Sequence, residues 1–397
     1  MNQRFYSLDI FRGATVALMI LVNTPGSWDH IFAPLEHASW HGCTPTDLVF
    51  PFFLFAVGNA MAFVLPKFSA GSHGTFFKKI IKRTLLIFTI GVLLNWCPFF
   101  KWSNNQLVVK PWAFINANSI ADGVRILGVL QRIAICYFFA AIIIHFFKTK
   151  GSILISGILL LSYWAICVLL NPTDPFSITG YFGRAVDIAI LGKAHMLHID
   201  TINGQVFHFD YEGLASTIGA VVQVLFGYFA GIFIITKGKT AEMLNALFVT
   251  AVALLFVGFC WDIVFPINKK IWSSSYTIYT TGLALLVLSI LIYAIEFKKY
   301  KSWATSFFDV FGKNALFIFV LSGALPRLLG LVRIQDGLNE FNKPIYLSPL
   351  GWLYQHFFKL ILPADARIGS LLYAIFFILI MWLAAYWLDK KKIYIKV

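Results

Sequence analysis

The chain has 397 residues, of which 59% are hydrophobic and 13% are charged, whereas soluble domains carry about 25% charged residues. This composition excludes an ordinary soluble enzyme. Apolar runs of about 20 residues, each long enough to cross a bilayer, recur from end to end and indicate a polytopic membrane protein. The net charge of +14 does not point to nucleic acid, because the basic residues gather in short connections between the apolar runs.

The apolar runs predict an all-α integral membrane protein, since they lack the period-2 alternation of membrane β-strands. About ten transmembrane helices are expected, and residues 1–397 form one membrane domain without a separate soluble part. The expected spans are 8–24, 44–65, 78–98, 124–147, 151–170, 213–236, 243–262, 275–296, 305–323 and 367–388. A further apolar stretch, 349–362, is short and polar in places, which favours a re-entrant or interfacial segment.

The distribution of lysine and arginine predicts that both termini lie inside. With the N-terminus inside, the inner connections receive basic clusters such as 78–83, and the tail adds the lysines of 390–396. Most acidic residues then fall outside. This is the positive-inside pattern, in which lysine and arginine set the orientation. An eleventh crossing would place the lysine-rich tail outside, so ten spans are preferred.

The stretch HASWHGCTPTDLVFPFFLFAVG, residues 37–58, places reactive side chains immediately before an apolar span. In the expected orientation His37, His41 and Asp47 lie at the outer face. Histidine titrates near neutral pH and can act as a general base or a nucleophile. Asp47 either orients the imidazole or caps the start of the helix.

Arginines within spans are functional candidates, because ionisable groups in the membrane are costly unless they are paired or hydrated. Arg12 lies near the start of the first span, and Arg125, Gln131 and Arg132 lie in the fourth. Arg125 and Arg132 are two helical turns apart and share a face, so their planar guanidinium groups can hold the phosphates of a carrier. The alternative is a structural ion pair with one of the nearby carboxylates. These are Asp9, Asp122 and Asp187.

Seven motifs follow one another along nearly the whole chain. They are SLDIFRG at 7–13, LVN at 21–23, HASWHGCTPTDLVFPFFLF at 37–55, GVLQR at 128–132, FDYEGLASTIGA at 209–220, FPINKKIWSSSY at 265–276 and FGKNALFIFVLS at 311–322. Together they resemble the heparan-alpha-glucosaminide N-acetyltransferase family. The chain looks like the compact bacterial form of that family, which starts directly at the SLDxFRG span.

The resemblance implies a transmembrane acyltransferase. Cytosolic acetyl-CoA supplies the acetyl group, and the amine of a glucosamine-like sugar at the outer face accepts it. The family's active histidine carries over to His37, and its asparagine carries over to Asn23. Acetyl transfer needs a deprotonated amine and a stabilised oxyanion, so His37 serves as the base or carries the acetyl group covalently, and Asn23 can donate to the oxyanion.

The expected acceptor-binding residues surround this histidine in the sequence or in the outer connections. They are Trp40, His41, Asp187, Glu212, Asn268 and Lys269. The CoA phosphates are assigned to Arg12, Arg125, Gln131 and Arg132, with Asp47 supporting catalysis and no metal. The expected partners are acetyl-CoA, the amino sugar and membrane lipid, without nucleic acid; a homodimer is left open.

The expected location is the bacterial cytoplasmic (inner) membrane. A transporter for amino sugars or their derivatives is the alternative function, because ten spans with buried arginines also suit transport. A transporter would place its polar site at the membrane midplane between repeats.

The orientation is testable with reporters that are active only outside the cytoplasm. A reporter fused after Val397 is expected to be inactive, and one inserted near Asn104 is expected to be active, because the basic clusters hold the tail inside. Measured enzyme activity of the two fusions in intact cells checks this. The reverse pattern would move His37 to the inner face.

Overall fold

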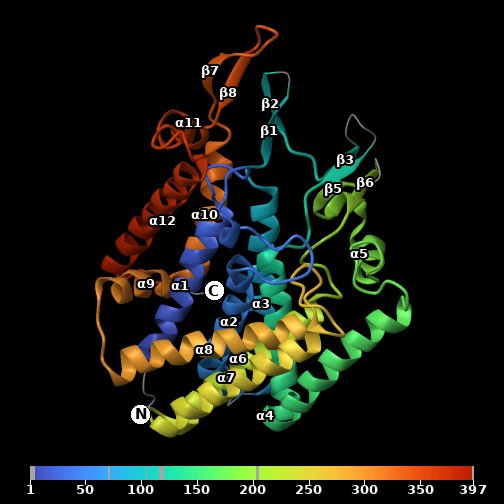
Figure 1. Ribbon diagram of the computed structural model, residues 1–397, viewed down its shortest axis with the longest axis vertical. Coiled ribbons are helices and arrows are strands. Elements are labelled where there is room, and N and C mark those ends of the chain that lie inside the picture. The colour runs from blue at the N-terminus through green and yellow to red at the C-terminus, as the bar shows by residue number, and fades with distance from the viewer. Residues whose placement is uncertain (1–4, 70–71, 104, 116–119, 203–204, 396–397) are drawn as a thin grey trace.

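Long helices dominate the computed structural model, which describes residues 5–69, 72–103, 105–115, 120–202 and 205–395 (Figure 1). The helices are α1 (Tyr6–Asn23), α2 (Val49–Ser69), α3 (His73–Trp96), α4 (Val129–Leu170), α5 (Gly183–Leu191), α6 (Thr217–Lys237), α7 (Ala241–Asp262), α8 (Ser274–Ile292), α9 (Trp303–Lys313), α10 (Ala315–Leu329), α11 (Pro349–His356) and α12 (Ala366–Lys390). The expected all-α membrane class is confirmed.

The number of qualifying spans is lower than expected. In the described part of the chain, seven helices are long and apolar enough to cross a membrane, or eight if the bent pair α9–α10 counts as one. The 42-residue α4 would extend about 63 Å if straight, roughly twice the hydrocarbon thickness. It contains the expected span 151–170 and residues 129–147 of the expected span 124–147, and it turns between them at Lys148, where φ is +56°. Arg125, which was expected in this span, lies before the helix. The expected span 78–98 corresponds to α3, which is not counted as a membrane span because its first half carries four cations.

The expected span 305–323 is broken rather than straight. Its two parts, α9 and α10, meet at an angle of 83°. The break lies at Asn314, whose side-chain amide donates to the carbonyl of Ile393 (3.0 Å) and accepts from the backbone N–H of Ile395 (2.8 Å). The chain end is thereby held against the middle of the helix bundle.

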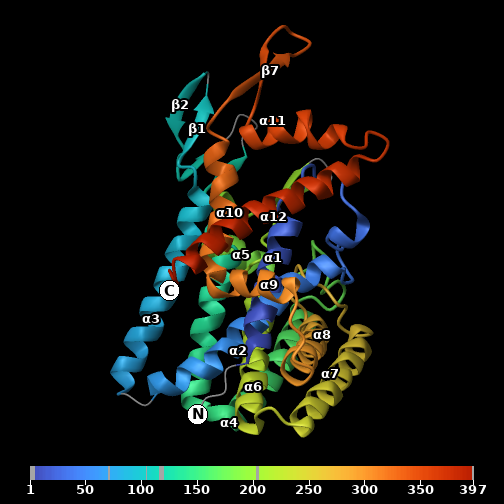
Figure 2. The ribbon, with the colours of Figure 1, turned by 90° about the vertical axis from the view of Figure 1, so that its left-hand side faces the viewer.

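Four antiparallel hairpins, which the sequence analysis did not predict, occupy the connections between helices. They are β1 (Phe100–Ser103) with β2 (Gln106–Val109), β3 (Ala113–Ile115) with β4 (Ala121–Gly123), β5 (His198–Ile202) with β6 (Gln205–His208), and β7 (Ile334–Leu338) with β8 (Pro344–Leu347). They gather at one end of the bundle, and the N-terminus lies at the other (Figures 1 and 2). We call the first of these the hairpin end. The stretch 349–362 forms only the eight-residue α11 and a 3-10 turn, Phe358–Leu360, and lies at the hairpin end.

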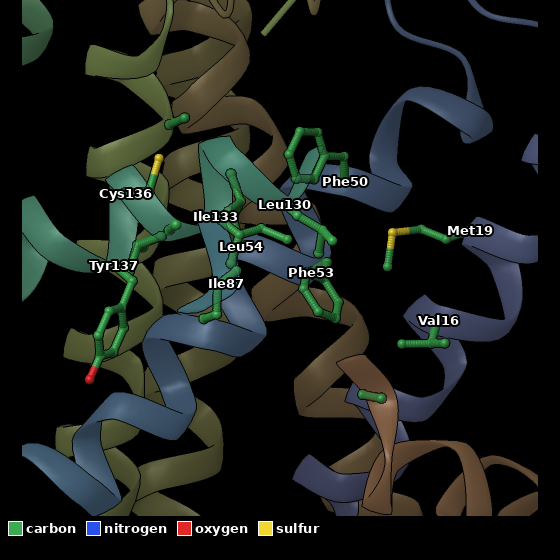
Figure 3. Packing of buried hydrophobic residues seen from close by; sticks show 14 of the residues in the cluster. Val16, Met19, Phe50, Phe53, Leu54, Ile87, Leu130, Ile133, Cys136 and Tyr137 are labelled. Atoms are coloured by element: carbon green, nitrogen blue, oxygen red, sulfur yellow. The ribbon is translucent and has the colours of Figure 1, made fainter. Parts of the chain in front are cut away.

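Apolar side chains from α1, α2 and α4 form the centre of the bundle (Figure 3). Leu54 is fully buried, and Phe50, Phe53, Leu130 and Ile133 are at most 6% exposed. Because lipid tails are as apolar as these side chains, close van der Waals packing rather than transfer from water stabilises this layer. This apolar layer lies just below the polar groups described next.

Helices α2 and α6 approach so closely that only glycine fits at two of their contacts. A Cβ on Gly58 of α2 would lie 1.9 Å from the carbonyl oxygen of Val224 on α6, and one on Gly227 of α6 would lie 2.1 Å from the carbonyl oxygen of Phe55. Small residues let membrane helices approach each other in this way.

Replacing Gly58 with alanine is therefore expected to lower the thermal midpoint in detergent, because α2 and α6 must move apart. Overpacking of this kind costs typically about 1–3 kcal/mol. Gly157→Ala is the matched control, since a Cβ there would meet nothing within 4 Å. Equal thermal midpoints for both variants would contradict the close contact.

Candidate functional site

Two loops from distant parts of the chain meet at the hairpin side of the apolar layer. The backbone N–H of Gly42 donates to the carbonyl of Ile267 (2.7 Å), and Gly42 and Asn268 form an isolated parallel bridge. Gly42 has φ of +103°, a conformation that glycine adopts without strain. The ammonium of Lys270 donates to the carbonyl of Ser39. The loop 36–47, before α2, is thus joined to the loop 263–273, between α7 and α8.

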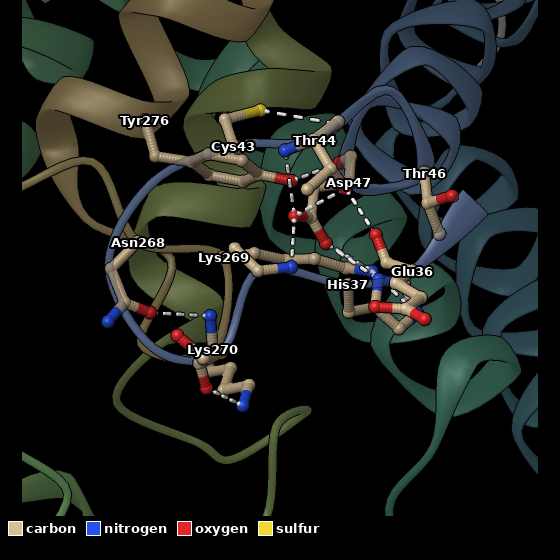
Figure 4. Close-up of polar contacts among 12 residues, drawn as sticks. Glu36, His37, Cys43, Thr44, Thr46, Asp47, Asn268, Lys269, Lys270 and Tyr276 are labelled. Atoms are coloured by element: carbon tan, nitrogen blue, oxygen red, sulfur yellow. Dashed lines mark hydrogen bonds and ion pairs between the residues drawn. The ribbon is translucent and has the colours of Figure 1, made fainter. Parts of the chain in front are cut away.

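Asp47 occupies the centre of this junction (Figure 4). Its Oδ2 accepts from the backbone N–H groups of Ala38 (3.0 Å) and Thr44 (3.1 Å) and from the Thr44 hydroxyl (3.1 Å). Thr44 and Asp47 form a reciprocal capping box that starts the 3-10 turn Pro45–Leu48, and proline suits the first position of such a turn. The tyrosine hydroxyl of Tyr276 donates to the Asp47 carbonyl (2.5 Å).

The other carboxylate oxygen of Asp47 orients His37. Oδ1 lies 2.6 Å from His37 Nδ1. Because an ionised carboxylate only accepts hydrogen bonds, we assign the proton to Nδ1, which leaves the Nε2 lone pair available. The His37 side chain is 43% exposed and that of Asp47 is 1% exposed. A buried carboxylate therefore holds a solvent-accessible imidazole in one tautomer. Asp47 therefore orients the imidazole of His37 and also caps the 3-10 turn before α2, the two roles considered from the sequence.

Lys269 completes the polar cluster. Its Nζ lies 3.4 Å from Asp47 Oδ1 and 3.1 and 3.5 Å from the two ring nitrogens of His37 (Figure 4). Burial lowers the pKa of Lys269, and the charges of Asp47 and Glu212 only partly restore it.

A cavity of about 260 Å³ opens beside these groups. Six of the expected site residues line it. They are Asn23, His37, Trp40, Asp47, Glu212 and Lys269. Lys270, Tyr211 and Trp272 also line it, and Met19, Val49, Phe50 and Val129 form an apolar wall. The cavity therefore combines an imidazole, carboxylates, amines and aromatic surfaces in a space that suits a small polar ligand.

The carboxylate of Glu212 lines this cavity, and the loop that carries it is bonded to Arg125. Arg125 donates through Nε to Asp210 Oδ2 (3.0 Å) and through Nη2 to Asp210 and Glu212. Burial by itself would raise the pKa of Glu212, but the charges of Arg125 and Arg132 hold it below its usual value. Glu212 is therefore a carboxylate facing the cavity.

Arg132 and Asp187 support the same loop. The Arg132 guanidinium is 1% exposed, donates to the Gly213 carbonyl (3.1 Å) and the Ser216 hydroxyl, and lies 5.1 Å from the Trp272 ring centre. Asp187 Oδ1 accepts from the backbone N–H of Leu214 (2.8 Å). Burial, together with the nearby Asp210, raises the pKa of Asp187 to about 7. Neither residue lines the cavity, although both were expected to contact a ligand.

Three more expected site residues lie outside this cavity. Gln131 is buried beside Gly91 on the far side of α4. The Asn268 side chain accepts from the backbone N–H groups of Lys270 (2.7 Å) and Ile271 (3.2 Å) and lies 3.3 Å from His41 Nδ1. Burial lowers the pKa of His41 despite the opposing charge of Asp262. Asn268 thus shapes the loop that presents Lys269.

A second cavity, of about 420 Å³, lies on the side of the apolar layer away from the hairpin end. Phe53 and Ile133 line it, whereas Phe50 and Val129 line the first cavity, so the two spaces lie on successive turns of α2 and α4 (Figure 3). Its basic residues are Arg12, Arg83 and Lys313. Arg12 also bonds Asp9 (2.9 Å) and the Gly312 carbonyl (2.8 Å), and Lys313 pairs with Asp309 (2.8 Å) and Asp389 (2.9 Å).

The sequence analysis missed several lining residues. Lys270 is next to the expected Lys269, and Lys313 lies in the FGKN part of a quoted motif. Both could therefore have been selected as site residues from the motifs that carry the resemblance. Arg83 was counted only as part of a basic inner connection. Among the described residues, no group of three or more His, Cys, Asp or Glu side chains is placed to hold a metal ion.

Comparison with known proteins supports the resemblance drawn from the motifs. No protein-family model matches the chain. The chain is 27% identical to the heparan-alpha-glucosaminide N-acetyltransferase of Homo sapiens over 369 residues, which covers 80% of this chain and 52% of the human protein. The Mus musculus protein of the same name is 26% identical over 370 residues, with 80% and 53% covered. The chain thus spans about half the length of these curated relatives.

The role of Arg125 can be tested through stability. Arg125→Ala leaves the carboxylates of Asp210 and Glu212 without their buried partner, and breaking such a pair typically costs about 3–5 kcal/mol. A large drop in thermal midpoint is expected in detergent. Arg367→Ala, which breaks an exposed pair with Asp365, is the control and should change little. A stable Arg125→Ala protein with weakened acetyl-CoA binding would instead make Arg125 a phosphate ligand.

Proposed function

We propose that this chain is a membrane acetyltransferase that moves an acetyl group from acetyl-CoA to the amine of a glucosamine-like sugar. The observation that carries the proposal is the Asp47–His37–Lys269 cluster, in which a buried carboxylate fixes an accessible imidazole at the edge of a cavity. The curated relatives bear the name of an N-acetyltransferase acting on a glucosaminide. The HASW and DLVFP motifs supply His37 and Asp47, and the FPINKK motif supplies Lys269.

In the proposed reaction, His37 Nε2 takes a proton from the acceptor amine as its nitrogen attacks the thioester carbonyl. Asp47 keeps Nδ1 protonated, so that Nε2 is the basic atom, and it stabilises the imidazolium that forms. A covalent acetyl-His37 intermediate would start from the same atom. Either route gives an acetylated amine and free CoA.

Charge on the thioester oxygen must be stabilised while the tetrahedral centre exists. Lys269 supplies a cation beside His37, and Asn23, at the end of α1, lines the same cavity and can donate an N–H. Glu212 offers a carboxylate to the acceptor's ammonium or hydroxyl groups. Trp40 and Tyr211 supply aromatic surface on which a sugar ring can pack.

The second cavity suits the donor. Phosphates are bound by arginine and lysine, and Arg12, Arg83 and Lys313 lie around a space with apolar walls. We therefore assign the CoA phosphates to this cavity, while Arg125 and Arg132 support the 209–216 loop. The donor then approaches from the inner side and the sugar from the hairpin end. In this proposal the protein lies in a cytoplasmic membrane with both termini inside.

The test is acetyl transfer by purified protein, with labelled acetyl-CoA and a panel of amino sugars. His37→Ala is expected to lose transfer by about 100- to 10,000-fold, because it lacks the general base, and to remain folded and bind acetyl-CoA. His41→Ala, which changes a histidine outside the cavity, should lose much less. Substantial transfer by a folded His37→Ala protein would remove the proposed mechanism and favour the transporter.

A further inference from the structure

The cavity contains an amine of the protein itself at the place where the acceptor amine must react. Nζ of Lys269 lies 3.1 Å from Nδ1 of His37 and 3.5 Å from Nε2, the nitrogen that acts as base in the proposed reaction, so a small movement brings Nζ into hydrogen-bond reach of Nε2. A lysine side chain and an amino sugar both present a primary amine. A base and a thioester that serve one of these amines in the proposed reaction can therefore also serve the other.

Lys269 differs from a surface lysine in its surroundings. Its side chain is 21% exposed, and burial lowers its pKa, so more of it is the neutral, nucleophilic amine at a given pH. Opposing this, the carboxylate of Asp47 at 3.4 Å favours the ammonium form. The titratable and charged groups that face Lys269 are Asp47, His37, Glu212, Cys43 and Lys270.

We propose that Lys269 is a self-acetylation site of the enzyme, at which acetyl-CoA modifies the protein when no sugar acceptor fills the cavity. This inference rests on the proposed function. The Nζ lone pair attacks the thioester carbonyl, a C–N bond forms and the C–S bond breaks. CoA leaves as the thiolate, and the proton lost by Nζ passes to it through His37.

The product is a dead end rather than a carrier. An amide does not transfer its acetyl group to another amine as a thioester does, so the modification persists. Acetylation removes the positive charge that pairs with Asp47 and adds bulk to a cavity of about 260 Å³. Acetyl transfer to sugar should therefore decline as Lys269 is modified, and bound sugar should protect it.

Lys270 is a matched internal control. It is the next residue, lines the same cavity and is also a primary amine. Its Nζ is directed elsewhere, since it donates to the Ser39 carbonyl and lies 5.7 and 5.2 Å from the ring centres of Trp40 and Tyr211. Specific chemistry at His37 should therefore mark Lys269 and spare Lys270.

The experiment incubates the full-length protein in detergent with isotope-labelled acetyl-CoA, with and without glucosamine, at about pH 6.5 and about pH 8.5. Peptide mass spectrometry then measures acetylation at every lysine. Label is expected on Lys269 without sugar, rising up to about tenfold per pH unit while the pH is below the pKa of that amine. Lys269→Arg removes the primary amine and should lose this label, and its transfer to sugar is measured in parallel because Lys269 belongs to the proposed site. Acetyl-imidazole at His37 is labile to hydroxylamine, whereas the lysine amide is not.

A parallel assay of sugar acetylation distinguishes failure of the self-acetylation inference from failure of the proposed function. If sugar is acetylated while Lys269 stays unmodified, the inference is wrong and the proposed function stands. Equal label on Lys269, Lys270 and exposed lysines means unspecific chemical acetylation and also overturns the inference. If neither sugar nor protein is acetylated by folded protein, the proposed function fails and the inference falls with it.

Discussion

The buried carboxylate of Asp47 is the constraint around which the site is built. Leaving such a charge in a protein interior costs several kcal/mol unless hydrogen bonds and opposite charges compensate for it. Backbone N–H groups of the 38–44 loop satisfy one oxygen, and His37 with Lys269 satisfies the other. The same contacts that make the burial of Asp47 tolerable therefore fix the loop, the histidine tautomer and the position of the lysine.

The second carboxylate of the cavity follows the same principle with a different partner. Glu212 faces the cavity because Arg125 neutralises it from behind, and Arg132 ties the following backbone to α4. A phosphate-binding role for these arginines was inferred from their spacing on one helix face. However, α4 begins at Val129, so Arg125 lies before the helix and shares no helix face with Arg132. Both arginines contact the 209–216 loop, whose acidic residues were not recognised as partners of Arg125 because they lie more than 80 positions away.

The membrane class, the helix positions and the residues around His37 could be predicted from the sequence, because hydropathy and the HASW–DLVFP stretch are local signals. The turn at Lys148 falls between the expected spans 124–147 and 151–170, but the break at Asn314 and the four hairpins could not be predicted. Asn314 lies inside the expected span 305–323, and its side chain bonds Ile393 and Ile395, which are far away in the sequence. The approach of Lys269 to His37 depends on the pairing of two loops that are over 200 residues apart.

The two cavities explain why a bundle of helices, rather than a soluble fold, suits the proposed reaction. A thioester near water is exposed to hydrolysis, and the layer of Phe50, Phe53, Leu130 and Ile133 separates the basic inner space from the accessible His37. In the proposed reaction only the slender end of the donor would pass this layer, while its phosphates would remain in the second cavity with Arg12, Arg83 and Lys313. Under that assignment the apolar layer keeps the charged part of the donor and the sugar on opposite sides, and the reacting atoms meet beside His37, which is held by Asp47.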